Sequence, residues 1–356
     1  MLAPISWPLP PMGYGPWELV AYNLTEALVE LGHDVTVFAA GGSRTSATLV
    51  ETVPHALETW PQNERSKPRR YDPSTGLLEG PPDGSVLQKL HIATCMERAA
   101  DGEFDVVHSH LHLHALVFGR LIGCPLVTTL HGSAWVRAHH PILMRYRDLP
   151  FVSISDAERT MLPELNFVAT VYNGIRLQCF PFEADKDDYL LFAGRLSPEK
   201  GPDVAIEVAR RSGRRLLMAG MIEPQYEPFF NDKVKPHIDG KNVEYLGLLS
   251  QESLAPIYRK AAGVLFTINW CEPFGLVAVE AQASGTPLIA TRFGALPEII
   301  VQGRTGFVVD SVDDAVRAVG RLADISPRAC RRNVESRFTA HTMAQGYARV
   351  YEAVAG

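Results

Sequence analysis

Paired cysteines, positive charge and long apolar runs are all scarce in this chain of 356 residues. The five cysteines lie far apart and form no CxxC pair, which disfavours a disulfide framework or a zinc knuckle and suits reduced thiols in a cytosol. The net charge of -6 excludes a nucleic-acid partner that relies on a strongly basic face. No stretch reaches the roughly 18 apolar residues of a membrane span. We therefore expect a soluble, cytoplasmic protein whose membrane contact is at most peripheral.

Short apolar strands alternate with helical stretches along the whole sequence. The first series of strands is predicted at "DVTVFAA", "DVVHSH", "PLVTTLHG" and "FVSIS", with helices after Trp17, around 86–100 and around 111–121. The second series is predicted at "YLLFAG", "RLLMAG", "VEYLG", "GVLFTI", "TPLIAT" and "TGFVV". Such alternation indicates parallel βαβ units. The fold class is therefore α/β, with two doubly wound, Rossmann-like domains whose ligands bind at the carboxyl ends of the strands.

The polar segment "NGIRLQCFPFEADKDD" separates the two series and predicts a boundary between domains 1–172 and 173–337. A second irregular segment, 53–83, is rich in proline and charge and predicts a long surface loop or lid. Its basic residues either lie in a solvated loop, the favoured interpretation, or touch an anionic lipid surface or an acidic acceptor. These residues are Arg65, Lys67, Arg69 and Arg70.

Two motifs resemble metal sites. "HSHLHLH" spaces His108, His110, His112 and His114 two apart, and residues two apart share one face of a strand, so an HxH pair can ligate zinc. The strand ends near His110, however, helical spacing follows, and the aspartate of the binuclear pattern HxHxDH is missing. The DxD within "DKDD", 185–188, precedes a strand instead of following one. Both are better explained without a metal, as a histidine-rich strand end and a solvated charge run.

"FAGRLSPEKGPDVAIEVA" places two cations, Arg195 and Lys200, at the end of a strand and beside the start of a helix. Ser197 and Pro198 suit the N-cap and the first helical position. Fixed cations near a helix N-terminus suit a diphosphate, although an ordinary capped turn would have the same sequence.

"WCEPFGLVAVEAQASGTPLIAT" supplies two carboxylates, Glu272 and Glu280, with a helix that begins between them near Phe274. Gly275 exposes the first backbone N–H groups of this helix to a phosphate. Two helical turns separate the glutamates by roughly 12 Å of axial rise. That spacing is about the reach from a sugar, across a diphosphate, to a ribose.

On these residues the chain resembles the retaining glycosyltransferases of family 4, which have the GT-B architecture. "GRLSPEKG" and the E-x7-E of "EPFGLVAVE" are the most specific motifs, supported by "YGPWELVAYNLTEALVELGHDVTVFA", "DVVHSH", "TLHG", "VYNGI" and "GALPEII". The resemblance covers nearly the whole chain. It implies a hexosyltransferase with a nucleotide-sugar donor, no metal and no other cofactor. It also implies an acceptor-side first domain, joined by a C-terminal helix at about 338–356 that crosses back onto it.

The resemblance assigns four residues to catalysis. Arg195 and Lys200 would neutralise the donor diphosphate, Glu272 would bind the transferred sugar, and His131 would lie beside the anomeric carbon. From the residues alone, the favoured interpretation of His131 is a strand-end side chain satisfied by the backbone. The implied mechanism retains configuration, because the acceptor hydroxyl attacks from the face that the nucleotide leaves.

The remaining donor contacts also follow from the resemblance. Glu280 would hold the ribose, and Gly15 in the first glycine-rich loop would approach the phosphates and the acceptor. Backbone amides would come from Phe274, Gly275 and Leu276. The base would lie near the loop after "VEYLG", at Leu246, Gly247 and Leu248.

The chain departs from the family at several points. The first-loop glycine pair is Gly15-Pro16, "NGI" is followed by Arg176 where aspartate is usual, and the pair before "LPE" is Gly294-Ala295. The start "MLAPIS" leaves little room for a first strand that should be central in its sheet, which suggests residues missing before Met1.

Alternatives remain open from the sequence. A nucleotide-sugar epimerase would share the nucleotide site but does not normally contain "GRLSPEKG", and a non-catalytic sensor of nucleotide sugars would share it too. A histidine-based metal hydrolase would leave both glutamates unexplained. Among donors, UDP-glucose is expected first and GDP-mannose next. The acceptor is expected to be a small molecule, a saccharide or a lipid-linked molecule. The sequence does not reveal the oligomeric state.

Overall fold

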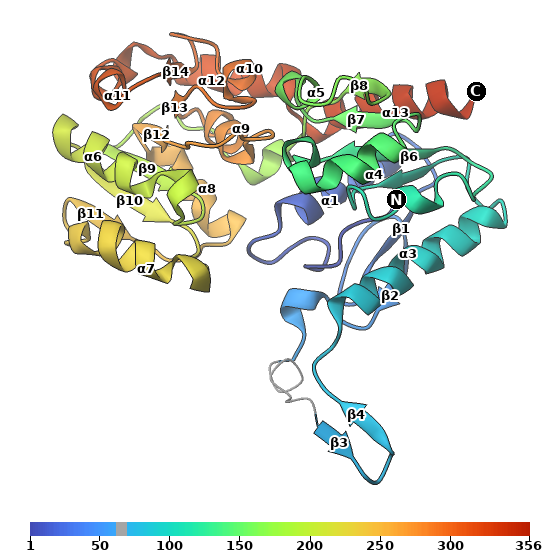
Figure 1. The fold of residues 1–356 in the computed structure, drawn as a ribbon. Helices are drawn as coiled ribbons and strands as arrows, with labels where there is room; N and C mark the ends of the chain where they lie inside the picture. The colour runs from blue at the N-terminus through green and yellow to red at the C-terminus, as the bar shows by residue number, and fades with distance from the viewer. Residues whose placement is uncertain (62–69) are drawn as a thin grey trace. The chain divides into compact units, whose positions relative to one another are not determined.

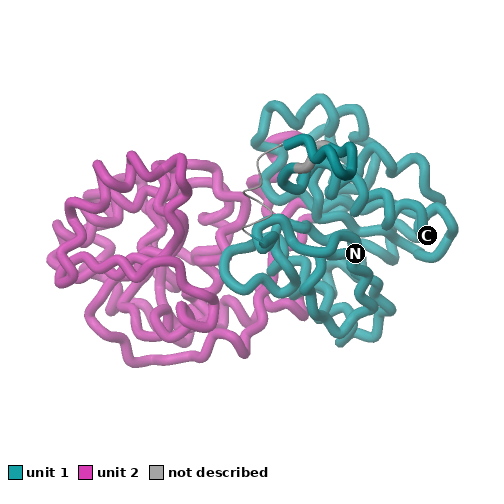
Figure 2. Tube along the Cα trace, turned by 90° about the horizontal axis from the view of Figure 1, so that it is seen from below, with its two compact units in different colours: residues 1–152, 163–169, 344–356 teal, residues 153–162, 170–343 magenta. Residues whose placement is uncertain are grey.

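A computed structural model describes residues 1–61 and 70–356, without the side chains of 78 and 79. The chain forms two compact units (Figure 2). Unit 1 contains Met1–Val152, Pro163–Ala169 and Ala344–Gly356, and unit 2 contains Ser153–Leu162 and Thr170–Met343. Both are Rossmann-like α/β units, as the sequence predicted. The division differs from the expected boundaries, because 153–162, 170–172 and 338–343 belong to unit 2. No helix among the described residues combines the length and the apolar character needed to cross a membrane.

The sheet of unit 1 is completed by the first residues of the chain. Leu2 pairs in parallel with both β1 and β5, between a β1-β2 pair and a β5-β6-β7-β8 group. Its N–H donates to the carbonyl of His108 at 2.8 Å, and the N–H of His110 donates to the carbonyl of Leu2 at 3.0 Å. Met1–Ala3 therefore takes the central position expected of the first strand. The strands are β1 (Thr36–Ala40), β2 (Thr48–Val53), β5 (Val107–Ser109), β6 (Leu126–Leu130), β7 (Phe151–Ser153) and β8 (Phe167–Thr170).

Two of the helices predicted for the first half are present, namely α1 (Pro16–Glu30) and α3 (Gly84–Ala100). The prediction of a helix around 111–121 is wrong, because only the short 3-10 turn η2 (Leu116–Phe118) forms there. His112 has φ 52°, a left-handed conformation that a helix of L-residues does not continue through. The other helical segments of this half are η1 (Leu57–Thr59), η3 (Ser133–Trp135), η4 (Arg137–His139), α4 (His140–Arg145) and α5 (Asp156–Arg159).

The segment predicted as a surface loop or lid contains an antiparallel hairpin. Its strands are β3 (Arg70–Asp72) and β4 (Leu77–Glu79), and Figure 1 shows the hairpin extending away from the body of unit 1. Arg70 opens β3 with an exposed side chain. Arg65, Lys67 and Arg69 lie outside the described residues, so their contact with lipid or acceptor stays a prediction.

Unit 2 contains a six-stranded parallel sheet in the order β11-β10-β9-β12-β13-β14. All six strands predicted for the second series are present. Because β9 comes first in the chain and lies beside β12, the order of strands reverses between these two. Ligands of such sheets bind outside the carboxyl ends of the strands at this reversal. The strands are β9 (Tyr189–Ala193), β10 (Arg215–Ala219), β11 (Val243–Tyr245), β12 (Gly263–Phe266), β13 (Leu288–Thr291) and β14 (Gly306–Val309).

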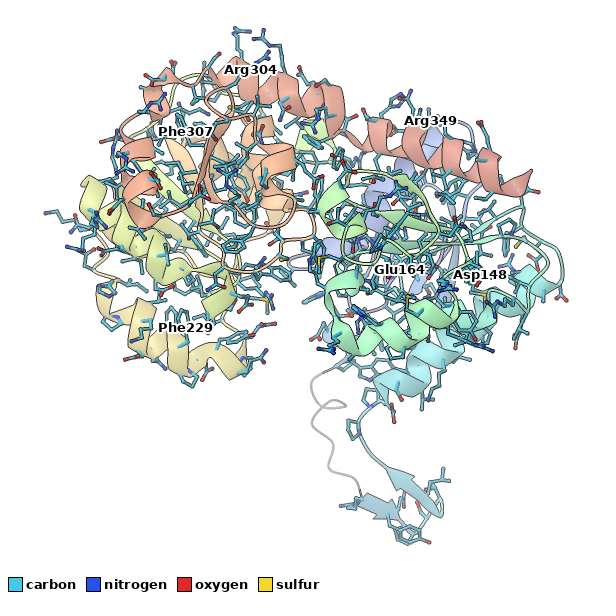
Figure 3. The ribbon with its side chains drawn as sticks, turned by 45° about the horizontal axis from the view of Figure 1, so that its top comes forward. Asp148, Glu164, Phe229, Arg304, Phe307 and Arg349 are labelled. Atoms are coloured by element: carbon cyan, nitrogen blue, oxygen red, sulfur yellow. The ribbon has the colours of Figure 1, made fainter. Side chains whose placement is uncertain are left out.

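Apolar clusters fill the space on the two faces of this sheet. Leu191 and Val264 point into one cluster, and Leu190 and Leu265 into the other, as alternation along a strand requires. Phe307 of β14 belongs to the second cluster (Figure 3). The helical segments are η5 (Leu177–Cys179), η6 (Pro198–Lys200), α6 (Pro202–Ser212), η7 (Pro224–Tyr226), α7 (Glu227–Phe229), η8 (Phe230–Val234), η9 (Lys235–His237), α8 (Gln251–Lys260), α9 (Leu276–Ala283), α10 (Leu296–Ile299), α11 (Val312–Val319), η10 (Leu322–Asp324) and α12 (Pro327–Arg337).

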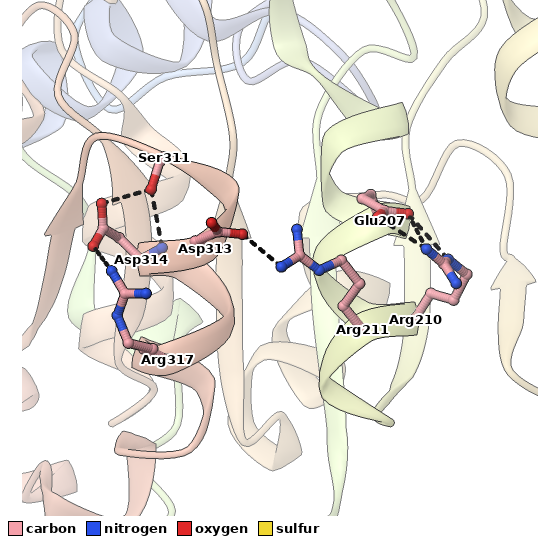
Figure 4. A network of polar contacts seen from close by, with 7 residues as sticks. All are labelled: Glu207, Arg210, Arg211, Ser311, Asp313, Asp314 and Arg317. Atoms are coloured by element: carbon pink, nitrogen blue, oxygen red, sulfur yellow. Dashed lines mark hydrogen bonds and ion pairs between the residues drawn. The ribbon is translucent and has the colours of Figure 1, made fainter.

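Charged side chains join α6 to α11 on the outside of unit 2 (Figure 4). Arg211 of α6 pairs with Asp313 of α11 at 2.5 Å. The Oγ of Ser311 caps α11 by accepting from the N–H of Asp314 at 3.1 Å. These pairs are solvent-exposed, so each contributes at most about 1 kcal/mol. The two apolar clusters therefore carry most of the stability of this unit.

The last helix, α13 (Ala340–Ala355), is anchored to unit 1 by two tyrosines. The hydroxyl of Tyr351 lies 2.7 Å from Nδ1 of His108, and Nε2 of His108 lies 2.7 Å from Oγ1 of Thr129. Thr129 in turn bonds the hydroxyl of Tyr347 at 2.8 Å. Both ring nitrogens of buried His108 are thus satisfied, which gives the first histidine of the run a structural role.

Replacing Tyr351 by Phe should lower the free energy of unfolding by about 1–3 kcal/mol, because Nδ1 of His108 then lacks a partner in a buried position. Urea unfolding followed by circular dichroism measures this loss. Tyr71, exposed on β3, provides the matched Tyr→Phe control and should change little. Equal losses in both variants would contradict the structural role of His108.

Candidate active site

The candidate site lies where the strand order of unit 2 reverses. One loop, 194–201, follows β9, and another, 267–275, follows β12. Between them the loops carry five of the residues predicted to contact the donor, namely Arg195, Lys200, Glu272, Phe274 and Gly275. Both leave the carboxyl edge of the sheet, where the resemblance placed a nucleotide.

Hydrogen bonds fasten these two loops to each other. Oγ1 of Thr267 donates to the carbonyl of Gly201 at 2.7 Å, and the N–H of Asn269 donates to the carbonyl of Glu199 at 3.0 Å. Gly201 has φ 66°, and a Cβ there would lie 2.1 Å from the carbonyl oxygen of Thr267. Only glycine permits both the backbone conformation and this close approach.

The positions predicted for Ser197 and Pro198 are present, but the helical segment that they start is short. Ser197 is the N-cap and Pro198 the first residue of the 3-10 turn η6, and the longer helix α6 begins at Pro202 after Gly201. The hydroxyl of Ser197 donates to the Glu199 carboxylate at 2.7 Å and makes no capping bond to the backbone.

Lys200 and Glu272 form an ion pair at the centre of the site. Nζ of Lys200 lies 2.6 Å from Oε2 of Glu272, with side-chain exposures of only 14% and 12%. The indole N–H of Trp270 donates to the same oxygen at 3.1 Å, and Nζ lies 4.6 Å from the centre of the Trp270 ring. Trp270 thus contacts both members of the pair. Sequence reasoning missed it, although its place two residues before Glu272 put it within reach.

Arg195 is also held by carboxylates. Its guanidinium lies 3.1 Å from Oε1 of Glu199 and 3.0 Å from Oε2 of Glu223, which follows β10. The predicted cations are therefore both present at the strand ends, each facing an acidic side chain. An anionic ligand can exchange with these carboxylates as the partner of the cations.

Glu280 lies in α9, 8% exposed, among neutral partners. Nε2 of Gln251 and the hydroxyl of Tyr258 each donate to its carboxylate at 3.2 Å. Burial raises the pKa of Glu280 above its ordinary value, and the two hydrogen bonds oppose that rise. A buried carboxylate with only neutral donors is costly for the fold, which suits a residue that serves a ligand. Neither Gln251 nor Tyr258 was identified from the sequence.

The start of α9 has the geometry expected for backbone donors. Gly275, with φ 96°, precedes the first helical residue, Leu276, and Phe274 is buried just before it. The first N–H groups of a helix lack intrahelical acceptors and are available to a ligand. The carbonyl of Glu272 is fixed by Ala295, whose N–H donates to it at 2.9 Å. Residue 295 contributes only its backbone N–H to this bond, so an alanine can make it in place of the second glycine that the family has before "LPE".

The predicted base region lies beside the end of β10. The N–H of Leu246 donates to the carbonyl of Met218 at 2.8 Å, and the N–H of Gly220 donates to the carbonyl of Gly247 at 2.9 Å. Leu248 has an exposed side chain. The loop is thus held by its backbone, and its side chain at 248 is open to a ligand.

The other two predicted residues, His131 and Gly15, belong to unit 1. Gly15, with φ 147°, precedes α1, and Pro16 takes the first helical position, where its missing N–H costs no helical bond. Nε2 of His131 lies 2.9 Å from Nδ1 of His110, and its Nδ1 has no hydrogen-bond partner. Its ring is therefore not satisfied by the backbone, contrary to the simpler of the two interpretations.

No group of three or more His, Cys, Asp or Glu side chains within 1–61 and 70–356 is placed to hold a metal ion. Among the histidines, His114 is exposed, and His108 faces Tyr351 and Thr129. In "DKDD", Asp188 pairs with Arg214. Lys186 is bound by three oxygens of neighbouring segments, and burial lowers its pKa to about 8.

Sequence comparisons identify the family, and structure comparisons match the fold. The sequence model described as "Glycosyl transferases group 1" matches residues 180–335, and "Glycosyltransferase Family 4" matches 18–178. The glycogen synthase of Mycobacterium tuberculosis is 29% identical, over 98% of this chain and 93% of that protein. A D-inositol 3-phosphate glycosyltransferase of Streptomyces scabiei is 31% identical, over 69% of this chain and 68% of that protein. The structure of Anabaena HepE in complex with UDP-glucose has a TM-score of 0.66 at 17% identity, over 94% of this chain and 95% of that one.

Two Rossmann-like units with this site define a glycosyltransferase of the GT-B architecture. The chain belongs to glycosyltransferase family 4, and it is an enzyme that transfers glycosyl groups.

Replacing Trp270 by Phe should lower turnover roughly tenfold, because a hydrogen bond to a charged group is worth about 1.5–3 kcal/mol and the aromatic face beside Lys200 is kept. Steady-state kinetics with the donor measures the change. Trp60→Phe in unit 1 is the matched control. Unchanged turnover in Trp270→Phe would contradict a positioning role for the indole N–H.

Replacing Glu280 by Gln should stabilise the free protein and weaken nucleotide binding by about 1–3 kcal/mol. A carboxyl whose pKa is raised by folding destabilises the fold as pH rises from its ordinary pKa through the raised one. The gain in melting temperature should therefore be larger at pH 8 than at pH 5. Exposed Glu252 provides the Glu→Gln control. Equal gains at both pH values, or unchanged nucleotide affinity, would refute the assignment.

Proposed function

We propose that the protein transfers a hexose from a nucleoside-diphosphate sugar to an acceptor hydroxyl with retention of configuration and without a metal ion. UDP-glucose is the first candidate donor and GDP-mannose the second. The observation that carries this proposal is the pair Lys200–Glu272 at the strand switch, 2.6 Å apart and flanked by Arg195. An ammonium group beside a carboxylate suits a donor in which a diphosphate adjoins a sugar.

The charges support a diphosphate ligand. Arg195 and Lys200 supply the positive charge that a divalent cation supplies in other sugar transferases, and the first amides of α9 add donors. A leaving nucleotide gains negative charge during transfer, so fixed cations stabilise the transition state more than the ground state. The likeness to a protein crystallised with UDP-glucose favours a uridine nucleotide.

In the proposed reaction, Glu272 accepts hydrogen bonds from hydroxyls of the transferred sugar, and Glu280 accepts from the ribose. The acceptor hydroxyl attacks the anomeric carbon from the face that the diphosphate leaves. Its proton passes to the departing phosphate oxygen. Catalysis then consists mainly of positioning and charge stabilisation, and none of the residues proposed for the site acts as a covalent nucleophile.

A thermal-shift panel of UDP, GDP, ADP and their sugars, run in EDTA, tests the donor. Stabilisation by one nucleotide in EDTA, followed by turnover of its sugar, is the expected result. The anomeric configuration of the product, measured by NMR, tests retention. Stabilisation only after zinc is added, or an inverted product, would overturn the proposal. Turnover of donor to an isomeric sugar without any acceptor would identify an epimerase instead.

Lys200→Ala should lower kcat by more than it weakens donor binding, because its charge acts on the leaving diphosphate. The comparison needs kcat from initial rates and donor affinity from calorimetry on the same preparation. Lys233→Ala, an exposed lysine of η8, is the control. A change confined to donor affinity would contradict the role of Lys200 in the chemical step.

A further inference from the structure

Unpartnered ring nitrogens gather at the carboxyl ends of β5 and β6 in unit 1. Five buried side-chain nitrogens on the segments directly after these strands have no hydrogen-bond partner: Nε2 of His110, Nε2 of His112, Nδ1 of His131, Nε1 of Trp135 and Nδ1 of His139. Buried polar groups in native proteins are almost always paired, so each orphan needs an explanation. Five on two adjoining loops point to a common ligand.

Trp17, in the first turn of α1, lies against this group of rings. Its ring centre is 4.5 Å from that of His112, edge to face, and 6.3 Å from that of His131. His112 and His131 are in turn joined, since the N–H of His131 donates to Nδ1 of His112 at 3.3 Å. Trp17 is nevertheless 43% exposed, whereas His131 is only 5% exposed. A partly exposed aromatic ring thus borders polar atoms that lack partners.

The conformation of His112 is part of the arrangement. Its φ of 52° is rare for a residue with a side chain, and it ends the helix predicted there. The same conformation accompanies the edge-to-face contact of its ring with Trp17. Backbone strain of this kind persists where the surroundings hold it, often at ligand sites.

The imidazoles of His110, His112 and His131 are uncharged at neutral pH. Burial lowers the pKa of His112 to about 3 and holds the pKa of His110 and of His131 well below the usual range. A neutral imidazole offers one donor and one acceptor, which suits a hydroxyl better than a phosphate. Arg137 is the basic residue between His131 and His139, and its side chain is exposed.

We propose that Trp17 and these ring nitrogens form an acceptor subsite for a neutral polyhydroxylated ring, such as a saccharide or a cyclitol. The C–H face of the ring stacks on the indole of Trp17, and its hydroxyls pair with the nitrogens of His112, His131 and Trp135. A flat aromatic acceptor would stack equally well but has too few hydroxyls for the nitrogens. A phosphorylated acceptor would depend on Arg137. This inference rests on the proposed transferase function and specifies its acceptor.

Saturation-transfer NMR tests the subsite without requiring turnover. Maltotriose and myo-inositol serve as neutral probes, and D-inositol 3-phosphate and glucose 6-phosphate as charged ones, each with the nucleotide that stabilises the enzyme. We expect transfer to the ring C–H protons of at least one neutral probe. Trp17→Ala should weaken that probe about tenfold, and Trp17→Phe should retain it. Trp60→Ala, remote from these rings in the sequence, is the matched control.

Trp135→Phe separates a ligand role from a structural one. It removes an indole N–H that has no partner, so the melting temperature should stay the same or rise. The affinity for the neutral probe should nevertheless fall about tenfold, the loss of one hydrogen bond. A fall in melting temperature with unchanged probe affinity would assign Trp135 to the fold alone.

Three results would overturn the subsite. They are no transfer to either neutral probe, equal binding by the wild type and Trp17→Ala, or binding of phosphorylated probes only, lost in Arg137→Ala. Melting curves of each variant exclude unfolding as the cause. Nucleotide binding, measured on the same samples, reports on the donor site separately. Failure of the nucleotide to bind would refute the proposed function, whereas normal nucleotide binding without probe binding refutes only this inference.

Discussion

The hydrogen bonds between the loops after β9 and β12 are the constraint on which the candidate site depends. Thr267 and Asn269 of one loop bind the backbone of 199–201 in the other, and Gly201 is the residue that permits the approach. Because the loops are locked together, Lys200 meets Glu272 at 2.6 Å although 72 positions separate them. Without these hydrogen bonds between the loops, pairing would have to order two long side chains. The conformational entropy lost would then exceed the free energy gained from the ion pair.

The two glutamates of the E-x7-E motif have opposite environments. Glu272 faces an ammonium and an indole N–H, so its negative charge is matched before any ligand arrives. Glu280 has only Gln251 and Tyr258, both neutral, and burial raises its pKa. The first arrangement stabilises a charge and keeps it oriented. The second buries a carboxylate without a positive partner, which costs free energy of folding, and in the proposed function the hydroxyls of the ribose offset that cost.

The fold class and the strands of both predicted series could be predicted from the sequence, because they depend on local periodicity. Short motifs also placed Arg195, Lys200 and Glu272 on the loops after β9 and β12, where the structure has them. The conformation around 111–121 could not be predicted, since its apolar spacing was right for a helix but His112 adopts a left-handed φ. The partners Trp270, Gln251 and Tyr258 were also missed. Their types fit many roles, and only contact with Glu272 or Glu280 distinguishes them.

The histidine run shows which features follow from the sequence alone and which depend on the tertiary structure. The sequence by itself determined that four histidines alternate at the end of a strand, and that two sheets follow one another, with a helix in the second that begins between Glu272 and Glu280. Tertiary structure decided that His108 anchors α13 through Tyr351, 243 positions away, that His110 pairs with His131, and that Trp17 covers His112. The physical reason is the separation along the chain of the residues that interact. Strand and helix patterns follow from neighbours in the chain, whereas hydrogen-bond partners and burial depend on segments that only folding brings together.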